Sequence, residues 1–307
     1  MNPGKQLKCA EQIGAAHDKI QLWMQSEMGR KQLDDQFKVR PPLVNMPTNS
    51  NNIAFFYQKL QDIVMSAAQY GGRDYMTSLC DIMTDEKSQL DAIARLRKVQ
   101  LYPSGNDTSQ QTVVDYDMSI AELAIESWNQ FSDDRSWIWQ TCNEFGYFQS
   151  TDTGSNVFRS TVPVNMFLNI CLDVFGMRAD SVQAAIDKTN AFYDARDYYT
   201  GTNVVAPYGT YDPWHFLAKQ KSVHHSVVIY EMKDATHCRD MLDANGDADI
   251  LEVQQLIQEN IDRWLNGPPN PDKKVKITDK VGQRPEIIPF NNAPLYFYSE
   301  KQSKRRV

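Results

Sequence analysis

Apolar and polar residues follow a helical spacing through the first half of the chain. Apolar side chains recur three and four positions apart, which is the pattern of amphipathic helices. It predicts helices at about residues 9–28, 52–69, 74–99 and 116–131. Gly29 is expected to end the first helix and Gly71-Gly72 the second, because glycine is common just beyond helix ends. The first half is therefore predicted to be a helical bundle.

In the second half the pattern changes from helices to short apolar runs. Helices are predicted at about 163–175 and 180–193, and the runs 202–206 and 226–230 are rich in β-branched residues. Two such strands joined by some twenty residues tend to lie parallel in one sheet. A last helix is expected to begin near Asp249, with Glu252 completing a capping box, and to end at Leu265.

Each predicted strand is followed by a candidate catalytic side chain. Asp212 follows the first strand and His237 follows the second. The carboxyl ends of parallel strands share one edge of a sheet, where α/β proteins carry out their chemistry. An acid followed by a histidine is the second half of a Ser…Asp…His triad in α/β-hydrolase order. In the alternative interpretation, Asp212 caps a turn and His237 is an ordinary loop histidine.

The first half of such a triad has no counterpart in these 307 residues. The nucleophilic serine of α/β-hydrolases lies in a G-x-S-x-G turn, and the sequence contains no such motif. Without a nucleophile, Asp212 and His237 have nothing to activate, so the chain by itself is expected to be inactive.

The segments around these two residues resemble one serine peptidase family. Asp212-Pro-Trp-His215 and Ala235-Thr-His237-Cys238 are similar to the catalytic segments of the family that contains lysosomal Pro-Xaa carboxypeptidase, dipeptidyl peptidase II and thymus-specific serine protease. Further similar segments occur in the same order at residues 140–147, 169–176, 202–205 and 261–265. The resemblance covers about residues 9–265 and is most specific over 137–240.

The resemblance implies a fold class and a domain organisation. The chain is expected to be α/β: the C-terminal part of an α/β-hydrolase with a large helical insertion, or cap, and without the N-terminal hydrolase strands. Residues 1–136 are then the cap, residues 137–265 the hydrolase part, and residues 266–307 a polar tail.

The resemblance also implies a function. It indicates a serine-type exopeptidase, a carboxypeptidase or dipeptidyl peptidase that cleaves next to proline, with Asp212 and His237 as catalytic residues and Trp214 in the substrate pocket. The expected partner is a peptide substrate, no cofactor or metal is implied, and a homodimer stays open. The alternative is a non-catalytic relative that binds a peptide or protein.

The sequence departs from this family in the turns that carry the two residues. Tyr208-Gly-Thr-Tyr211 precedes the acid, where the family usually has Asn-Gly-Ser-Leu. Lys233-Asp-Ala235 precedes the histidine segment, where the family usually has a glycine. Glycine in such turns often supplies a positive φ, so these changes bear on the local geometry.

Charge and hydropathy exclude several other classes of function. The net charge of −7 argues against nucleic acid as the main partner. No apolar run approaches the 18 residues of a membrane span, and the first residues lack the apolar core of a signal peptide. In residues 243–254 the sixth position is Ala248 and the twelfth is Gln254, where a calcium-binding EF-hand loop has glycine and glutamate.

The cysteines and one sequon bear on the compartment. The five disulfide candidates are Cys9, Cys80, Cys142, Cys171 and Cys238. Five is an odd number, so one cysteine lacks a partner within the chain, and sequence alone also allows five reduced thiols. The family is secreted or lysosomal, which fits disulfides and N-glycosylation at Asn106 in Asn106-Asp-Thr108.

Overall fold

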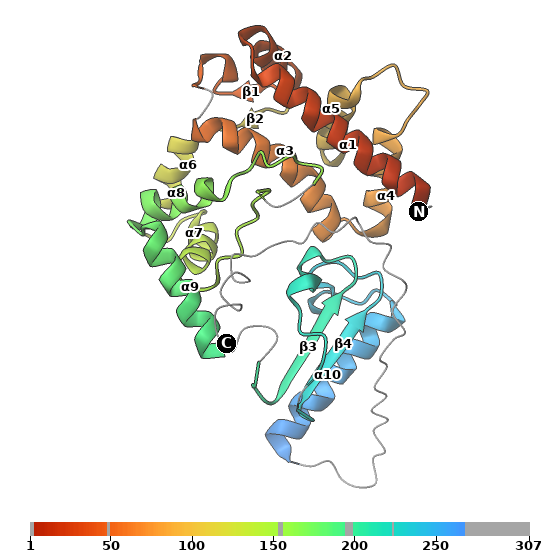
Figure 1. Cartoon of the computed structure of the whole chain (residues 1–307). Helices are drawn as coiled ribbons and strands as arrows, with labels where there is room; N and C mark the ends of the chain where they lie inside the picture. The colour runs from red at the N-terminus through yellow and green to blue at the C-terminus, as the bar shows by residue number, and fades with distance from the viewer. Residues whose placement is uncertain (1–2, 48–49, 153–155, 194–198, 223, 268–307) are drawn as a thin grey trace, which may run out of the picture. The chain divides into compact units, whose positions relative to one another are not determined.

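We describe a computed structural model of the chain (Figure 1), in which residues 3–47, 50–152, 156–193, 199–222 and 224–267 are described. Most of the predicted tail at 266–307 lies outside these residues. The chain folds into two compact units. Among the described residues, those within 3–65 and 77–190 belong to the first unit, and those within 66–76 and 191–267 belong to the second. The predicted domain boundary at residue 136 stays a prediction.

The first unit is built from helices. Its elements are α1 (Pro3–Met24), α2 (Glu27–Phe37), α3 (Asn51–Tyr70), α4 (Gly72–Met83), α5 (Ala92–Leu101), α6 (Tyr116–Leu123), α7 (Ser132–Gln140), α8 (Val164–Phe175), α9 (Ala179–Tyr193) and the short helices η1 (Leu43–Asn45), η2 (Tyr102–Ser104) and η3 (Thr141–Phe145). The end of α3, the start of α4 and the end of α9 belong to the second unit. A short parallel pair, β1 (Val39–Arg40) and β2 (Thr112–Val113), joins two loops of the first unit.

The predicted end of the first helix is wrong. Gly29 lies inside α2, and α1 ends at Met24. The hydroxyl of Ser26 accepts a hydrogen bond from the Gly29 amide at 3.0 Å and so begins α2 as its N-cap. A Cβ on Gly29 would lie 2.1 Å from the carbonyl oxygen of Trp23, so glycine is needed here for a close backbone approach.

Two other predicted helices have different bounds. The segment 74–99 forms two helices, α4 and α5, because Asp91 accepts a hydrogen bond from the Ala94 amide at 2.8 Å and starts a new helix. The predicted helix 116–131 ends at Leu123, whose carbonyl accepts a hydrogen bond from the Arg135 guanidinium at 2.5 Å. Apolar spacing continues across these breaks and so does not reveal them. The hydrogen bonds at the helix ends show where each helix stops or starts.

The core of the first unit lies between helices that are both near and distant in sequence. Helix α1 packs against α2 and α5. The largest fully buried side chains include Ile20, Leu33, Phe37, Phe56, Leu60 and Leu96. Two disulfides fasten the unit: Cys9–Cys80 joins α1 to α4, and Cys142–Cys171 joins η3 to α8. Four of the five predicted disulfide candidates are therefore paired.

The second unit contains the two predicted strands. Strands β3 (Val204–Gly209) and β4 (Val227–Met232) pair in parallel, with Val204 opposite Val227 and Gly209 opposite Met232. The predicted strands and their parallel arrangement are confirmed. The short helices η4 (Pro213–Leu217) and η5 (Arg239–Met241) follow the strands, and α10 (Ala248–Asn266) completes the unit.

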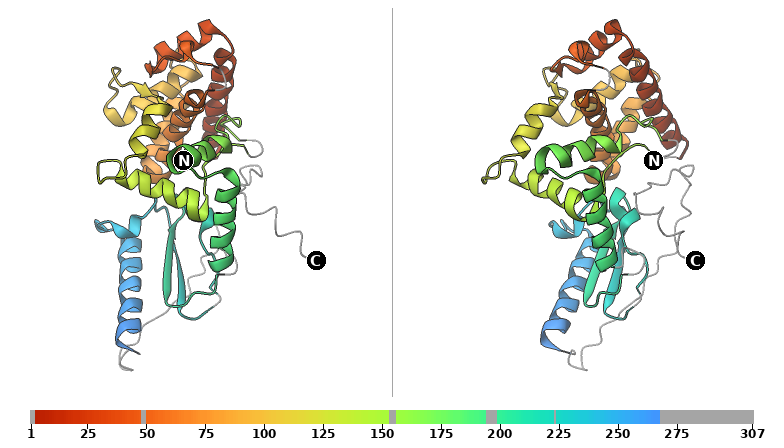
Figure 2. Two further views of the ribbon diagram at one scale, coloured as in Figure 1. Left: turned by 90° about the vertical axis from the view of Figure 1, so that its left-hand side faces the viewer. Right: turned by 60° about the vertical axis from the view of Figure 1, so that its left-hand side comes forward.

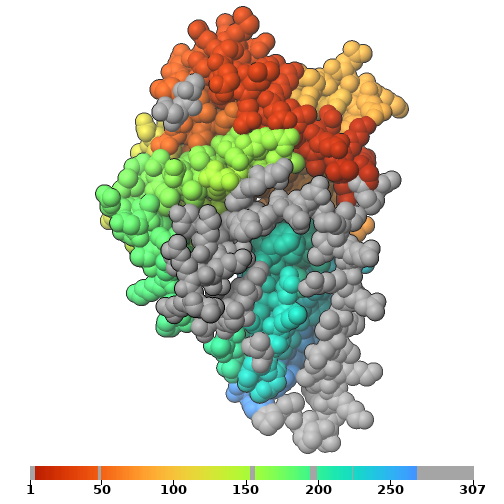
Figure 3. Space-filling model, viewed as in Figure 1, coloured from red at the N-terminus to blue at the C-terminus, as the bar shows by residue number. Residues whose placement is uncertain are grey.

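Helix α10 covers one face of this pair of strands. It runs beside both strands in each view of Figures 1 and 2 and packs against them. The buried cluster between them is Met232, Ala235, Ala244, Ile250 and Val253, with Tyr230 and Ile257 packed at its border. The residues of β3 before Gly209 are half-buried. In the view of Figure 3, this strand lies at the molecular surface.

The predicted cap of the last helix is displaced by two residues. Asp247, and not Asp249, is the N-cap, and its carboxylate accepts from the Asp249 amide at 3.1 Å. The Asp249 carboxylate accepts instead from the Tyr230 hydroxyl at 2.7 Å and from the Lys233 amide at 2.9 Å. Asp249 therefore links α10 to the end of β4. Sequence spacing alone does not show whether an aspartate at this position makes such a link or caps the helix.

Candidate active site

The turns after β3 and β4 lie against each other. The Thr210 amide donates to the Met232 carbonyl at 3.0 Å, and the Tyr211 amide donates to the Ala235 carbonyl at 3.0 Å. A Cβ on Gly209 would lie 2.3 Å from the same Ala235 oxygen, so only glycine allows this approach. The two turns therefore hold the residues that follow them at one edge of the sheet.

This edge brings Asp212 and His237 into direct contact. Oδ2 of Asp212 lies 2.8 Å from Nδ1 of His237. Asp212 is 7% exposed. The His237 side chain keeps 30% of its accessible surface. A carboxylate oxygen can only accept a hydrogen bond, so the proton of a neutral imidazole lies on Nδ1 and Nε2 is left as an acceptor. Within the described part of the chain, no side chain hydrogen-bonds to Nε2.

The rest of the Asp212 turn fixes the carboxylate. Oδ1 accepts from the Trp214 amide at 3.0 Å, so both carboxylate oxygens are engaged. The backbone oxygen of Asp212 lies 2.6 Å from Nδ1 of His215, and this contact anchors the turn. The ring of Trp214 lies 6.3 Å from that of His237, centroid to centroid. All three predicted residues, Asp212, Trp214 and His237, thus lie together.

A corner between α3 and α4 also contacts the histidine, and sequence analysis missed it. The His237 amide donates to the Gln69 carbonyl at 2.9 Å. The rings of Tyr70 and His237 are 5.8 Å apart and nearly perpendicular. The Arg73 guanidinium donates to the Asp234 carboxylate at 2.7 Å. In the sequence, this segment is recognisable only as a helix end, at Gly71-Gly72. The hydrophobic pattern contains nothing that links it to residue 237.

The turn before His237 contains a residue with a positive φ. Asp234 adopts a φ of 59°, a left-handed conformation that favours glycine. Its amide donates to the Thr210 hydroxyl at 2.8 Å, and its carboxylate pairs with Arg73. These contacts hold a non-glycine residue in that conformation, and the turn still delivers His237 to Asp212.

Cys238 is the unpaired cysteine. Among the described residues the other four cysteines pair with each other, and the Cys238 thiol is free and exposed. Its assignment as half of a disulfide stays a prediction. Partial burial raises the pKa of the Cys238 thiol, and the carboxylates of Asp240 and Asp212 raise it further. The thiol is thus held in its less reactive protonated form beside His237.

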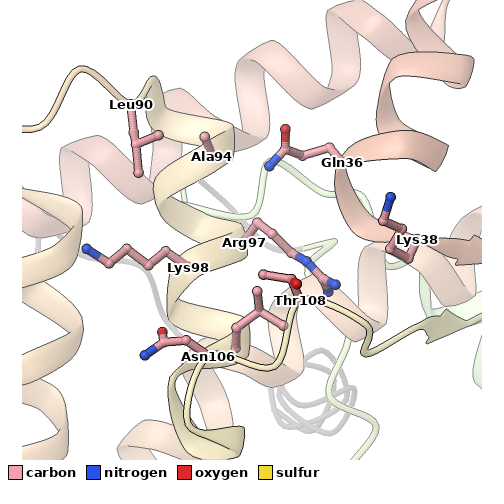
Figure 4. A pocket seen from close by; sticks show the side chains of 9 residues that line it. Gln36, Lys38, Leu90, Ala94, Arg97, Lys98, Asn106 and Thr108 are labelled. Atoms are coloured by element: carbon pink, nitrogen blue, oxygen red, sulfur yellow. The ribbon is translucent and has the colours of Figure 1, made fainter.

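A groove in the first unit offers different chemistry. A groove of about 370 Å³ lies along α5 and is lined by Gln36, Lys38, Leu90, Ala94, Arg97, Lys98, Leu101, Asn106 and Thr108 (Figure 4). Among the residues that the structure describes, no carboxylate, imidazole or thiol lines it. The predicted glycosylation residue Asn106 is exposed at this groove. Its lining residues supply no acid–base pair, so the groove is not a candidate for peptide hydrolysis.

The described residues contain no candidate metal site and no candidate membrane-spanning helix. Over this part of the chain, no three His, Cys, Asp or Glu side chains cluster in a way that could hold a metal ion. No described helix combines the length and hydrophobicity needed to cross a bilayer. Asp243 accepts from the Asn245 amide at 2.8 Å, so this part of the acidic segment forms a turn.

Comparison with known proteins matches residues 3–257 to the family model of serine carboxypeptidase S28. "Putative serine protease F56F10.1" of Caenorhabditis elegans is 28% identical over 288 residues, which cover 86% of this chain and 53% of that protein. The human thymus-specific serine protease is 31% identical over 135 residues, 43% of this chain and 26% of that protein. "Probable extracellular serine carboxypeptidase" of Arthroderma benhamiae is 31% identical over 129 residues, 38% of this chain and 15% of that protein.

The chain spans about half the length of the curated relatives that it matches over most of its own length. The family match nevertheless includes both strands, both turns and about the first half of α10. With more than half of its residues matched by one family model, this chain belongs to the serine carboxypeptidase S28 family.

Proposed function

We propose that Asp212 and His237 are the acid and the base of a serine peptidase. The observation that carries the proposal is the 2.8 Å contact between Oδ2 of Asp212 and Nδ1 of His237 after two parallel strands. A buried carboxylate that holds Nδ1–H fixes the tautomer in which Nε2 can accept a proton. Membership of a serine carboxypeptidase family supports the same assignment.

In this mechanism His237 moves one proton in each direction. Nε2 takes the proton of a serine hydroxyl as the oxygen attacks the peptide carbonyl, and the imidazolium formed is stabilised by the Asp212 carboxylate. The same proton then passes to the leaving amine, which leaves an acyl-serine. Water deacylates the enzyme by the reverse path, and His237 returns to its neutral form.

The nucleophilic serine belongs, in this proposal, to sequence outside these 307 residues. The motif expected for it is absent from the chain, and the relatives that the chain matches over most of its own length are about twice as long as the matched region. We place β3 and β4 in the C-terminal part of an α/β-hydrolase sheet and the helices before residue 137 in its cap. The chain by itself is then expected to give no peptidase turnover.

The substrate is proposed to be a peptide cleaved next to proline near one end. Trp214 supports this preference, because its ring lies beside the imidazole and a flat indole suits the apolar ring of proline. Secretion or delivery to the lysosome is supported by the two disulfides and by the name of the extracellular relative. Glycosylation at the exposed Asn106 and a homodimer remain predictions.

The test uses the natural gene product that contains this chain, expressed in a secretory host. Asp212→Asn and His237→Ala are each expected to lower kcat on a proline-containing peptide by roughly 10⁴-fold, because one loses the tautomer and the other the base. His224→Ala is the matched control, since His224 is exposed and bonded to Ser226 instead of Asp212. Full activity in the Asp212 and His237 variants contradicts the assignment.

A second measurement examines the 307-residue chain alone. Clear hydrolysis of the same peptide by this chain overturns the proposal that its nucleophile lies elsewhere. If the natural gene product has no nucleophilic serine either, the alternative is favoured, in which the chain is a non-catalytic relative that binds peptides or proteins.

A further inference from the structure

We infer that the corner formed by residues 69–73 positions the imidazole of His237 for proton transfer, with Tyr70 as its positioning residue. The inference rests on the proposed function, because it assigns a task at the same site. No pattern in the sequence joins this corner to the histidine, and the comparisons assign it no role.

The first step of the argument is the backbone of the histidine turn. The His237 amide donates to the carbonyl of Gln69 at 2.9 Å, near the last residue of α3. Gly72 has a φ of 63°, and a Cβ there would touch the Thr236 side chain at 3.4 Å. The corner at residues 69–73 therefore contacts the histidine turn in two places. One is the hydrogen bond to the backbone of His237, and the other is the close approach of Gly72 to Thr236.

The second step is charge. Arg73 donates to Asp234, and charge and hydrogen bonding at Tyr211 and Asp234 raise the pKa of Arg73. Tyr211 precedes Asp212, and Asp234 lies three residues before His237. The Arg73 guanidinium thus ties this corner to the turn that carries the base. This pair lies at the surface, where ion pairs add little stability, so its clearest consequence is geometric.

The third step is the ring of Tyr70. It meets the His237 ring nearly at a right angle, with centroids 5.8 Å apart. Its hydroxyl accepts from Nε2 of the Gln69 amide at 2.9 Å. Tyr70 is 64% exposed and so contributes little to the core. With Nδ1 held by Asp212 and the ring flanked by Tyr70, rotation of the imidazole away from its reacting orientation is restricted.

The first experiment uses the 307-residue chain and needs no activity. Proton NMR of the chain is expected to show the downfield resonance of the His237 Nδ1–H bonded to Asp212. Tyr70→Ala and Arg73→Gln should broaden it by exchange with water, whereas Tyr70→Phe should retain it. Trp128→Ala and Arg178→Gln are the matched controls, because each removes an exposed ring or ion pair in the first unit.

The second experiment measures peptide hydrolysis by the natural gene product that contains the chain. Tyr70→Ala is expected to lower kcat by roughly 3- to 10-fold with little change in KM, and Tyr70→Phe to stay within about twofold. A lower kcat at constant KM separates positioning of the base from substrate binding.

The outcomes distinguish this inference from the proposed function. An unchanged resonance and an unchanged kcat in Tyr70→Ala overturn the positioning role alone. A rise in KM at constant kcat also overturns it, because Tyr70 then contacts substrate instead of positioning the base. If the unaltered chain lacks the Nδ1–H resonance and Asp212→Asn keeps full activity, the proposed function itself fails.

Discussion

His17 is a buried histidine that has no hydrogen-bond partner among the described residues. It lies on α1 with no exposed surface, and within this part of the chain neither Nδ1 nor Nε2 has a partner. Its ring packs edge-on against Phe158 at 5.3 Å. Burial, together with the charge of Arg159 and against the opposing charge of Asp18, lowers the pKa of His17 to about 4. His17 is therefore neutral in the folded protein above that pH.

This neutral histidine predicts acid sensitivity of the first unit. The unfolded chain binds a proton at His17 below pH 6.5, whereas the folded chain binds it only near pH 4. The contribution of His17 to stability is present above pH 6.5 and is lost as pH falls toward 4, with about 2 kcal/mol lost by pH 5. His17→Leu should therefore lose less unfolding free energy than the unaltered chain between pH 7 and pH 5, by urea titration.

An exposed histidine provides the control for this measurement. His225 lies at the surface, and His225→Gln should keep the pH dependence of the unaltered chain. Equal acid sensitivity of His17→Leu and the unaltered chain would show that another group is responsible.

At the scale of elements, caps and turns decide where the helices of this chain begin. Apolar spacing located α3, α8 and α9 to within about two residues of their observed bounds, and it joined α4 to α5. The carboxylate of Asp91 separates that second pair, because it satisfies an amide at the start of α5. A cap is a single hydrogen bond and has no periodicity, so helical spacing does not detect it.

The N-cap of α10 gives a test at this scale. Asp247→Ala is expected to lower the stability of the second unit by about 1 kcal/mol, because the Asp249 and Ile250 amides lose their acceptor. Hydrogen exchange of the first turn of α10 should report the loss. Asp262→Ala, an exposed change later in the same helix, should have almost no effect. A similar effect of both changes would contradict the capping role.

At the scale of the whole molecule, the two units are stabilised differently. Cys9, Cys80, Cys142 and Cys171 all lie in the first unit. The second unit, over its described residues, contains only the free Cys238. The bridges close loops with sequence separations of 71 and 29 residues. Loops of this length correspond to stabilisation of about 4 kcal/mol each in the chain-entropy model.

Reduction is therefore expected to affect the units unequally. With a phosphine reductant, amide exchange should accelerate in α1, α4 and α8, while β3 and β4 keep their protection. Hydrogen exchange followed by mass spectrometry measures both in one sample. A Cys238→Ser variant under the same conditions controls for thiol chemistry at the free cysteine. Equal loss of protection in both units would contradict this division of stability.

The sequence by itself determined the elements and the candidate chemistry. Helical spacing and β-branched runs predicted most helices and both strands, because local side-chain patterns follow the geometry of the elements they form. Chain order and connection length predicted that Asp212 and His237 meet, because parallel strands place their carboxyl ends at one edge. Family motifs indicated a serine peptidase, and the family match confirmed that membership.

Only the tertiary structure decided the contacts between residues distant in sequence. It paired Cys9 with Cys80 and Cys142 with Cys171, and left Cys238 free. It also brought Tyr70 to His237, across more than 160 residues of chain. Such contacts depend on how the packed elements meet in space. The local pattern of apolar and polar residues in one sequence does not show which distant surfaces become neighbours.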